Sequence, residues 1–361
     1  GYVDDYNGWN PLTNTDDYGT GAHGTNCLGM IGAKGDNGLN VVGANWDVKL
    51  MVVGGYNINT QAGVIAAYTY PLVMRKRWNQ SNGTEGAFVV ATSASWGLDG
   101  ADANNYPLWC QFYDTLGYHG ILNIGATTNS NLNVDTAGDM PTTCSSPYMV
   151  GVGRTDHNDN TAGGYGVNTI EFGAPGINVV TTAGTSSITT TTGTSFACPL
   201  TAGVVGLAYS IPCPSFMSIV KANPQMGADL VLEALIGGVD VKSQLATRFK
   251  TSGRLNAKNT LDLLMEETCS SCIVTDVTAN PTSNNVVVVF TAAAEVNTVD
   301  LKWREVGSAT WTTVSGITSP YDLSGLNNCS AYEYTLVTNC TDDSGETSIA
   351  TFNTSGCGNC I

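Results

Sequence analysis

Between Val48 and about Val180, short apolar runs alternate with longer amphipathic stretches. Apolar runs of about four to eight residues spaced by helical stretches are typical of a parallel β-sheet covered by helices. The expected strands are Val48–Gly54, Gly86–Thr92, Gly120–Ala126, Tyr148–Arg154 and Thr169–Phe172. Helices are expected at Gln61–Trp78 and Asn104–Leu116, where Pro71 and Pro107 either kink or delimit them. The fold class is therefore α/β, and sites in such folds lie at the carboxyl ends of the strands.

The pattern changes around Glu266–Cys272, where the helical stretches stop. Short β-rich runs separated by turn residues follow, which predicts a small all-β sandwich. These runs are Val286–Phe290, Thr298–Trp303, Thr310–Val314, Tyr332–Thr338 and Ser348–Phe352. We expect two domains, an α/β domain at residues 1–265 and a sandwich at residues 269–361.

Composition limits the partners of the chain. Its 361 residues carry a net charge of −16, which repels nucleic acid and anionic lipid surfaces. Hydrophobic residues make up 42% and charged residues 12%, so the chain is globular and not disordered. No apolar run reaches the roughly 18 residues of a membrane span. The sequence begins at Gly1 with neither an initiator Met nor a signal-peptide pattern, and we expect the chain to be a processed or truncated product.

Eleven cysteines, with few lysines, favour an oxidising, extracellular setting, and the odd number leaves at least one thiol free. Cys27 and Cys198 lie in segments expected to be helical and buried, so we interpret both as core residues and not as catalytic thiols. Cys110 and Cys144 are candidates for one disulfide.

Two Cys-x-x-Cys pairs bracket the expected sandwich, Cys269–Cys272 and Cys357–Cys360. Four such thiolates can bind zinc in a tetrahedron, but disulfides are the favoured interpretation in a secreted chain. Cys329 and Cys340 are further candidates for disulfides.

Two distant segments carry the residue types of a hydrolytic centre. His23 opens a glycine-punctuated stretch, Gly21–Ala33, that is expected to be a short helix. Ser195 follows Gly193-Thr194 and precedes the apolar stretch Ala197–Ala208, a second expected helix with Pro199 in its first turn. A serine hydroxyl becomes a strong nucleophile when an imidazole takes its proton, and the positive end of a helix favours the charge that develops.

Together these segments resemble the subtilisin-like serine proteases over about the first 265 residues. The resemblance rests on His23-Gly24-Thr25, on Gly193-Thr194-Ser195-Phe196-Ala197-Cys198-Pro199, on Ser95-Trp96-Gly97 and on Gly173-Ala174-Pro175-Gly176, in family order. It implies that Ser195 is the nucleophile, His23 the general base and then acid, and Asn129 the side-chain donor to the oxyanion. Thr128 stands where the family has glycine before that asparagine. The implied activity is hydrolysis of peptide bonds through an acyl-enzyme, which requires no cofactor.

The resemblance also implies how substrate binds. An extended peptide would lie between Ser95, Trp96 and Gly97 on one side and Gly54 and Gly55 on the other, as an added strand. Trp96 indicates a bulky wall near the primary specificity pocket.

The third member of the family's triad does not precede His23. The family's acid ends an apolar strand with Asp-Ser/Thr-Gly, whereas Asp4 and Asp5 stand in polar, turn-like sequence. We expect the acid on a separate N-terminal fragment that remains associated with this chain. Asp4 and Asp5 resemble an acidic loop that contributes to a structural calcium site in some relatives; the alternative is that they are solvated surface carboxylates.

Two further alternatives concern the class of protein. The fold can belong to a catalytically inactive binding or adhesion protein in which the sandwich carries the function. A lipase or esterase is disfavoured, because no Gly-x-Ser-x-Gly elbow surrounds Ser195. The sandwich resembles fibronectin type III domains, on Leu326 and Tyr332 as a tyrosine corner and on Trp303 as a core tryptophan, and it serves either for attachment or as a spacer.

Overall fold

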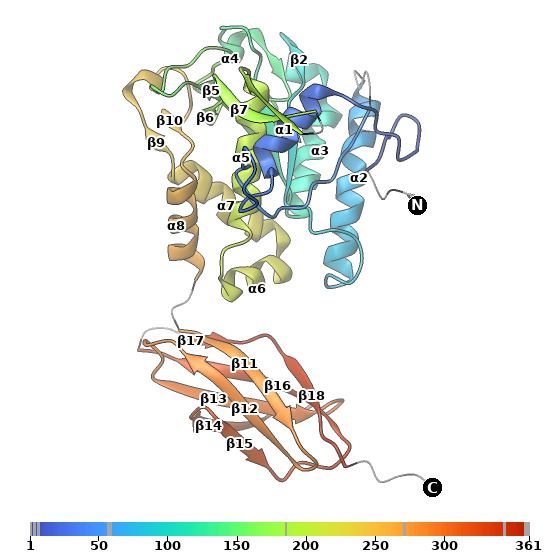
Figure 1. Cartoon of the computed structure of the whole chain (residues 1–361), viewed down its shortest axis with the longest axis vertical. Coiled ribbons are helices and arrows are strands. Elements are labelled where there is room, and N and C mark those ends of the chain that lie inside the picture. The colour runs from blue at the N-terminus through green and yellow to red at the C-terminus, as the bar shows by residue number, and fades with distance from the viewer. Residues whose placement is uncertain are drawn as a thin grey trace. The chain divides into compact units, whose positions relative to one another are not determined.

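The computed structural model describes residues 2, 5, 8–55, 60–184, 186–269, 272–341 and 344–356. The chain divides into two compact units (Figure 1). Unit 1 comprises residues 1–212 and 219–267, and unit 2 comprises residues 213–218 and 268–361. In the part of the chain that the structure describes, no helix is both long and apolar enough to cross a membrane.

A six-stranded sheet forms the centre of unit 1, with the strand order β1-β3-β5-β6-β10-β9. The first five strands in this order pair in parallel, and β9 pairs antiparallel with β10. Their bounds are β1 Ala91–Ala94, β3 Leu122–Ala126, β5 Met149–Thr155, β6 Phe172–Pro175, β9 Asp240–Val241 and β10 Gly253–Arg254. Two two-stranded ribbons accompany the sheet, β2 (Leu98–Asp99) with β4 (Asp139–Met140) and β7 (Val179–Ala183) with β8 (Ser187–Thr191).

Helices cover this sheet (Figure 1). Helix α5 packs against four strands, β1, β3, β5 and β6, and against helix α1, while α3 packs against β3 and α2. The bounds are α1 Ala22–Gly32, α2 Gln61–Gln80, α3 Pro107–Tyr118, α4 Val134–Ala137, α5 Thr194–Ala208, α6 Pro214–Ala222, α7 Pro224–Gly237 and α8 Ala257–Thr268, with short 3-10 turns at Ala103–Asn105 and Ser243–Leu245. The α/β arrangement expected from the sequence, a parallel sheet flanked by helices, is therefore confirmed.

The expected elements in the middle of unit 1 are found. Strands β3 and β5 coincide with the apolar runs Gly120–Ala126 and Tyr148–Arg154, and β3 is buried at every residue. Helix α2 begins as expected at Gln61, where Thr60 caps it by accepting a hydrogen bond from the Gly63 amide (3.1 Å), and it continues past Pro71. Helix α3 begins at Pro107, because proline fits the first turn of a helix.

Two strand boundaries were wrong. Strand β1 begins at Ala91, near the end of the expected range Gly86–Thr92, and β6 begins only at Phe172. Before β6, the Asp135 carboxylate accepts hydrogen bonds from the Asn168 amide (3.1 Å) and the Thr169 hydroxyl (2.7 Å). These bonds hold residues 168 and 169 in a turn, so they cannot join the sheet.

The expected strand Val48–Gly54 was also wrong. In this run only Val53 makes a β-bridge, a parallel one to Trp9, and Leu50 is 38% exposed. A strand requires a neighbour to pair with its backbone groups. This run has no described sheet neighbour other than the short segment around Trp9, which accounts for its irregular backbone.

Unit 2 is a sandwich of antiparallel strands. One sheet has the order β11-β12-β15, and the other has the order β14-β13-β16-β17, with β18 also pairing with β16. The bounds are β11 Val274–Pro281, β12 Asn285–Ala292, β13 Thr298–Glu305, β14 Thr312–Ile317, β15 Tyr321–Ser324, β16 Ala331–Asn339, β17 Ser344–Glu346 and β18 Ala350–Asn353. Alternate residues such as Val286, Val288 and Phe290 point into its core. All five expected runs are strands, and β11, β15 and β17 were not expected.

Disulfides stabilise both units. Unit 1 contains Cys110–Cys144, the pair expected from the sequence, and unit 2 contains Cys213–Cys269 and Cys272–Cys340. Cys329 is disulfide-bonded as well, while Cys357 and Cys360 lie outside the described residues. The bonded state of Cys269 and Cys272 excludes zinc at that pair.

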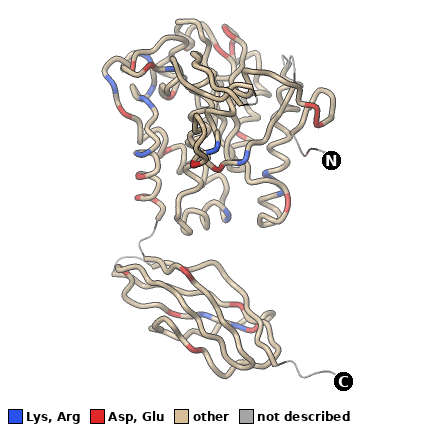
Figure 2. The backbone as a smooth tube through the Cα atoms, viewed as in Figure 1, with Lys and Arg blue, Asp and Glu red and all other residues tan. Residues whose placement is uncertain are grey.

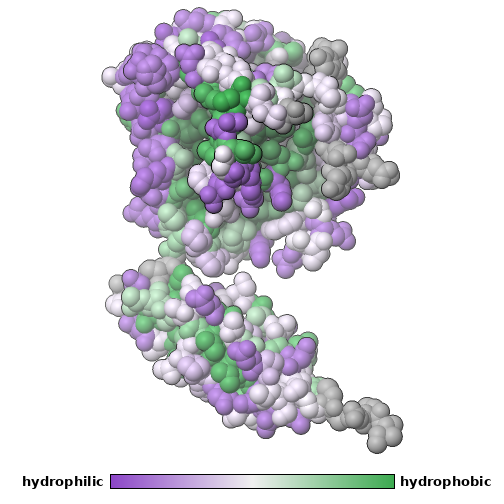
Figure 3. Space-filling view, viewed as in Figure 1, coloured by the Kyte–Doolittle hydropathy of each residue, from purple (hydrophilic) through white to green (hydrophobic). Residues whose placement is uncertain are grey.

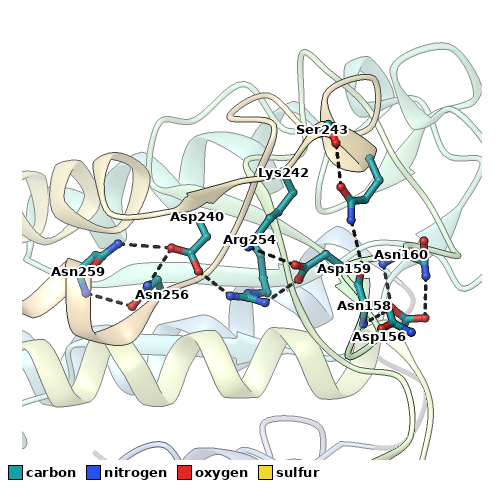
Figure 4. A network of polar contacts seen from close by, with 11 residues as sticks. Asp156, Asn158, Asp159, Asn160, Asp240, Lys242, Ser243, Arg254, Asn256 and Asn259 are labelled. Atoms are coloured by element: carbon teal, nitrogen blue, oxygen red, sulfur yellow. Dashed lines mark hydrogen bonds and ion pairs between the residues drawn. The ribbon is translucent and has the colours of Figure 1, made fainter.

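Charged residues are sparse and lie scattered along the backbone, as Figure 2 shows for Lys and Arg. A polar network joins β10 to a loop after β5 (Figure 4). In it, Arg254 donates to Asp159 (2.7 Å) and to Asp240 (2.5 Å). Lys242 lies 3.3 Å from Asp159, and Asp156 accepts the backbone amides of Asn158 and Asn160, so the loop is fixed at several points.

Glu171, immediately before β6, is a buried carboxyl group with 9% exposure. Burial raises its pKa to about 7, although the Gly151 amide donates to it (2.7 Å) and Lys250 lies 3.8 Å away. A raised carboxyl pKa means that the folded state favours the neutral form, so stability is lost as pH rises from about 4.5 to 7.

We therefore predict that Glu171→Gln raises the free energy of unfolding at pH 8, by up to about 3 kcal/mol, and changes it little at pH 4.5. Urea unfolding at both pH values measures this, with exposed Glu266→Gln as the control. A loss of stability at pH 8 in Glu171→Gln would contradict the assignment.

Candidate active site

Helices α1 and α5 lie side by side because glycine occupies the points of closest approach (Figure 1). A Cβ atom at Gly203 of α5 would lie 2.8 Å from the carbonyl oxygen of Ile31 on α1. A Cβ atom at Gly29 of α1 would lie 2.2 Å from the Thr182 hydroxyl. A larger side chain at Gly203 would therefore force the two helices apart, and one at Gly29 would push α1 away from β7.

Two threonines of β7 fix the position of α1. Thr181 donates its hydroxyl to the carbonyl oxygen of Asn26 (2.7 Å), and Thr182 donates to that of Thr25 (2.9 Å). Helix α1 is thus held by β7 and α5 together. His23 stands in its first turn, exposed at its surface.

The contacts of Cys27 bring His23 and Ser195 into one neighbourhood. The Cys27 sulfur lies 3.9 and 4.0 Å from the two ring nitrogens of His23 and donates to the carbonyl oxygen of Ser195 (3.3 Å). The imidazole also lies beside the ring of Phe196, with 5.9 Å between centroids. The structure therefore places the expected base next to the segment that carries the expected nucleophile.

Cys27 and Cys198 are both free thiols in the described part of the chain. Cys198 is fully buried, as expected, whereas Cys27 is only partly buried. Burial raises the pKa of both thiols, that of Cys198 to about 12, so they remain protonated at neutral pH. This supports the interpretation of both as packing residues and not as nucleophiles.

Ser195 lies in the first turn of α5 and is partly exposed. Its carbonyl oxygen also accepts a hydrogen bond from the Ser95 hydroxyl (2.8 Å). Ser95 follows directly after β1, so the end of that strand is tied to the first turn of α5. The positive end of the helix dipole at this turn favours negative charge near the Ser195 hydroxyl.

The side-chain oxygen of Asn129 accepts three hydrogen bonds. The donors are the Thr194 amide (3.1 Å), the Thr194 hydroxyl (3.3 Å) and the guanidinium of Arg154 (2.8 Å). Thr194 directly precedes Ser195. Asn129 therefore lies next to the expected nucleophile, as the sequence predicted. The three hydrogen bonds to its side-chain oxygen fix the orientation of its side-chain amide.

Thr128, the departure from the family pattern, is held by two carboxyl groups. Its amide donates to Asp139 (3.2 Å) and its hydroxyl to Asp99 (2.7 Å), and these acids face each other on the β2–β4 ribbon. Burial raises the pKa of Asp139 to about 6, and the nearby charge of Asp99 adds to the shift. These contacts fix the backbone that leads into Asn129.

The segment Ser95–Gly97 leaves β1 and runs into β2. Trp96 is 38% exposed and stacks on the buried ring of Trp109, with 5.6 Å between centroids. Gly97 lies against the backbone of Met140, where a Cβ atom would lie 2.0 Å from the carbonyl oxygen. The segment is thus a rigid wall beside Ser195.

Gly54 and Gly55 have a different environment. The Gly54 amide donates to the carbonyl oxygen of Trp9 (2.8 Å), and a Cβ atom there would lie 2.4 Å from Tyr18. Gly55 has a positive φ of 145°. These contacts tie Gly54 to the N-terminal segment, and the role of both glycines in substrate binding stays a prediction.

Of the two expected calcium ligands, Asp4 lies outside the described residues. Asp5 accepts a hydrogen bond from the Tyr70 hydroxyl (2.9 Å). Within the described ranges, no three His, Cys, Asp or Glu side chains come together as a metal site. The calcium site therefore stays a prediction.

Four neighbours of the segment around Asn129 were not predicted from the sequence: Arg154 and Thr194 beside Asn129, and Asp99 and Asp139 beside Thr128. One signal was available for Arg154, because it ends an expected parallel strand, where functional side chains gather. The two acids gave no local signal, since their ribbon forms only through tertiary pairing.

Ser95 and Asn129 follow the carboxyl ends of parallel strands, and both lie beside the first turn of α5. The family model described as the subtilase family matches residues 1–234, and the chain belongs to that family. It is therefore of serine protease kind. No curated protein matches it.

Several solved structures resemble the chain. One is titled the S218A mutant of the protease domain of PatA, with 19% identity, a TM-score of 0.49, and coverage of 69% of this chain and 82% of that one. Another is a cold adapted subtilisin-like serine proteinase, with 21% identity, a TM-score of 0.48, and coverage of 69% and 80%. A third is the A-subunit of the AB5 toxin from E. coli, with 16% identity, a TM-score of 0.47, and coverage of 67% and 78%.

We predict that Gly203→Ala lowers the rate of any reaction that needs His23 and Ser195 together, by about tenfold or more, because it pushes α1 away from α5. Gly206→Ala is the matched control one turn along α5, since a Cβ atom there meets its nearest atoms at 3.4 Å. The rate of covalent labelling of Ser195 by a fluorophosphonate measures the effect. Equal rates in the two variants would show that close helix packing does not position the site.

Proposed function

We propose that this chain is the catalytic part of a secreted serine endopeptidase. The observation that supports this most is the convergence of His23, Ser195 and Asn129, from three separate segments, on the first turn of α5. Cys27 contacts both the imidazole and the Ser195 backbone, and Thr194 contacts Asn129. The disulfides and the acidic net charge agree with an extracellular site of action.

In the proposed mechanism, His23 takes the proton of the Ser195 hydroxyl as it attacks a peptide carbonyl. The carbonyl oxygen becomes an oxyanion, which accepts a hydrogen bond from the side-chain nitrogen of Asn129. His23 then protonates the leaving amine, and water hydrolyses the acyl-enzyme. Substrate would lie extended along Ser95–Gly97, with Trp96 beside the primary specificity pocket.

Labelling with a serine-directed fluorophosphonate tests this proposal. We expect one adduct per chain, located on Ser195 by peptide mass spectrometry, with none in Ser195→Ala. His23→Ala should slow labelling by about a thousandfold or more, because the hydroxyl loses its base.

The same experiment separates the protease from the inactive binding protein. An unlabelled Ser195 in folded chain, with a cooperative thermal transition, would favour the binding protein. A label on Ser195 that forms equally fast in His23→Ala would contradict the assignment of the base.

We further propose that the missing acid arrives on an extended segment that pairs with the free edge of β1. In the described part of the sheet, β1 pairs only with β3, and its residue Ser93 is exposed, whereas β3 is buried throughout. The apolar run 48–54, expected as a strand, lacks a place in the sheet. On the face drawn in Figure 3, apolar side chains lie in a recess of unit 1. A parallel strand added at β1 would fill such a gap, since interior parallel strands are covered on both edges.

Comparing two forms of the protein tests this second step. The form that carries an apolar segment ending in Asp-Ser-Gly, joined before Gly1 or added as a peptide, should be labelled about 10³–10⁴ times faster than the chain alone. Replacing that Asp by Asn, with the strand unchanged, should remove the gain. A gain that survives the Asn replacement would mean that the strand acts by stability alone.

For unit 2 we propose a fibronectin type III-like sandwich that attaches the enzyme to a substrate or surface. The Tyr332 hydroxyl accepts a hydrogen bond from the Asn327 amide (2.8 Å), which is the contact of a tyrosine corner. Tyr332 packs on Phe352 and Trp303 inside the sandwich.

A further inference from the structure

Asn129 can serve an oxyanion only if its amide faces the right way. The side chain of asparagine carries an acceptor oxygen and a donor nitrogen at its end, and rotation by half a turn exchanges them. An asparagine that presented its oxygen would repel a developing oxyanion. Something in the structure must therefore fix the orientation of this amide.

Arg154 supplies the strongest contact of this kind. One of its terminal nitrogens donates to the side-chain oxygen of Asn129 (2.8 Å), and the other donates to the backbone oxygen of the same residue (3.4 Å). An arginine has donors and no acceptor, so only the oxygen of the amide can face it. The backbone N–H of Thr194 also donates to the side-chain oxygen of Asn129 (3.1 Å), and it too can face only an acceptor.

Arg154 is itself held in place. It stands near the end of β5, its Nε donates to the carbonyl oxygen of Ala162 (2.5 Å), and its own carbonyl oxygen accepts the Thr161 hydroxyl (2.7 Å). The loop that carries Ala162 is anchored by the polar network of Asp156 and Asp159 (Figure 4). Three donors of one guanidinium are thus used on backbone and amide oxygens.

The charge of Arg154 is not neutralised locally. Across the described ranges, no carboxylate lies within ion-pair distance of its guanidinium. A cation bound to the amide oxygen polarises the amide and makes its N–H groups better donors. The same charge favours a negative oxygen on the far side of the amide.

We propose that Arg154 is a positioning residue that orients Asn129, so that its side-chain nitrogen donates to the oxyanion. The inference rests on the proposed function, because it assigns the role of Arg154 within that mechanism. It adds a residue from β5 to the site and explains why the asparagine is functional although its preceding residue, Thr128, departs from the family pattern.

The rate constant for fluorophosphonate labelling of Ser195 tests this inference, since the phosphoryl oxygen occupies the oxyanion position. Arg154→Met should lower this rate constant about 10- to 100-fold, and Arg154→Lys should lower it less, because lysine keeps the charge and loses the paired donors. Arg248→Met is the matched control. Arg248 also donates to a neighbouring asparagine, Asn131 (3.3 Å), and its guanidinium covers the ring of Tyr165. Its variant should label at the wild-type rate.

A double-mutant cycle distinguishes positioning from a general structural role. In the Asn129→Ala background, Arg154→Met should change the rate constant by less than about twofold, because the group that Arg154 orients is already gone. Thermal unfolding of each variant is measured in parallel. An equal loss in both backgrounds, or a wild-type rate in Arg154→Met, would overturn the inference. Failure of the wild-type chain to label at all would instead overturn the proposed function.

Discussion

The close approach of α1 and α5 is the constraint on which the rest of the site depends. His23 and Ser195 are separated by most of unit 1 in the sequence, and each stands in the first turn of its helix. Close packing of α5 on the backbone of α1 at Gly203 brings the imidazole to the segment of the hydroxyl. The threonines of β7 fix α1 from its other side, so the helix has little freedom to move away.

A second arrangement builds on this one at the strand ends. Asn129 follows β3, Arg154 is near the end of β5, and Thr194 begins α5, so three elements meet at one amide. Hydrogen bonds hold this amide by its oxygen from two sides. These contacts fix the direction in which the side-chain nitrogen of Asn129 points. By contrast, β1 pairs only with β3 within the described residues, and its other edge is where we propose that the added strand binds.

The sequence predicted the parts of this fold that depend on local pattern. The buried strands β3 and β5 and the helices α1, α2, α3 and α5 follow from apolar runs, a threonine cap and proline positions. Five sandwich strands follow from short β-rich runs between turn residues, whereas β11, β15 and β17 were not predicted. Local pattern could not predict elements that depend on tertiary pairing. The run 48–54 has the pattern of a strand, but a strand forms only where a neighbouring strand pairs with it. The turn before β6 depends on the Asp135 carboxylate, which lies more than thirty residues earlier in the chain.

For the site, motifs identified His23 and Ser195 and placed Asn129, and the structure brings all three together. Gly54 packs against Tyr18 of the N-terminal segment, which no motif indicated. Arg154, Asp99 and Asp139 act through hydrogen bonds across strands, and such contacts have no period or spacing in the sequence. Asp4 falls outside the described residues, so the calcium site at the acidic loop stays a prediction.

The distance between the Ser195 hydroxyl oxygen and the nearer ring nitrogen of His23, measured in a crystal structure of the protein with an oxyanion-mimicking inhibitor bound, tests the account most directly. We predict hydrogen-bond reach, about 2.6–3.2 Å. A separation of more than about 6 Å in the inhibited protein would contradict the account, because no proton could then pass between the two groups.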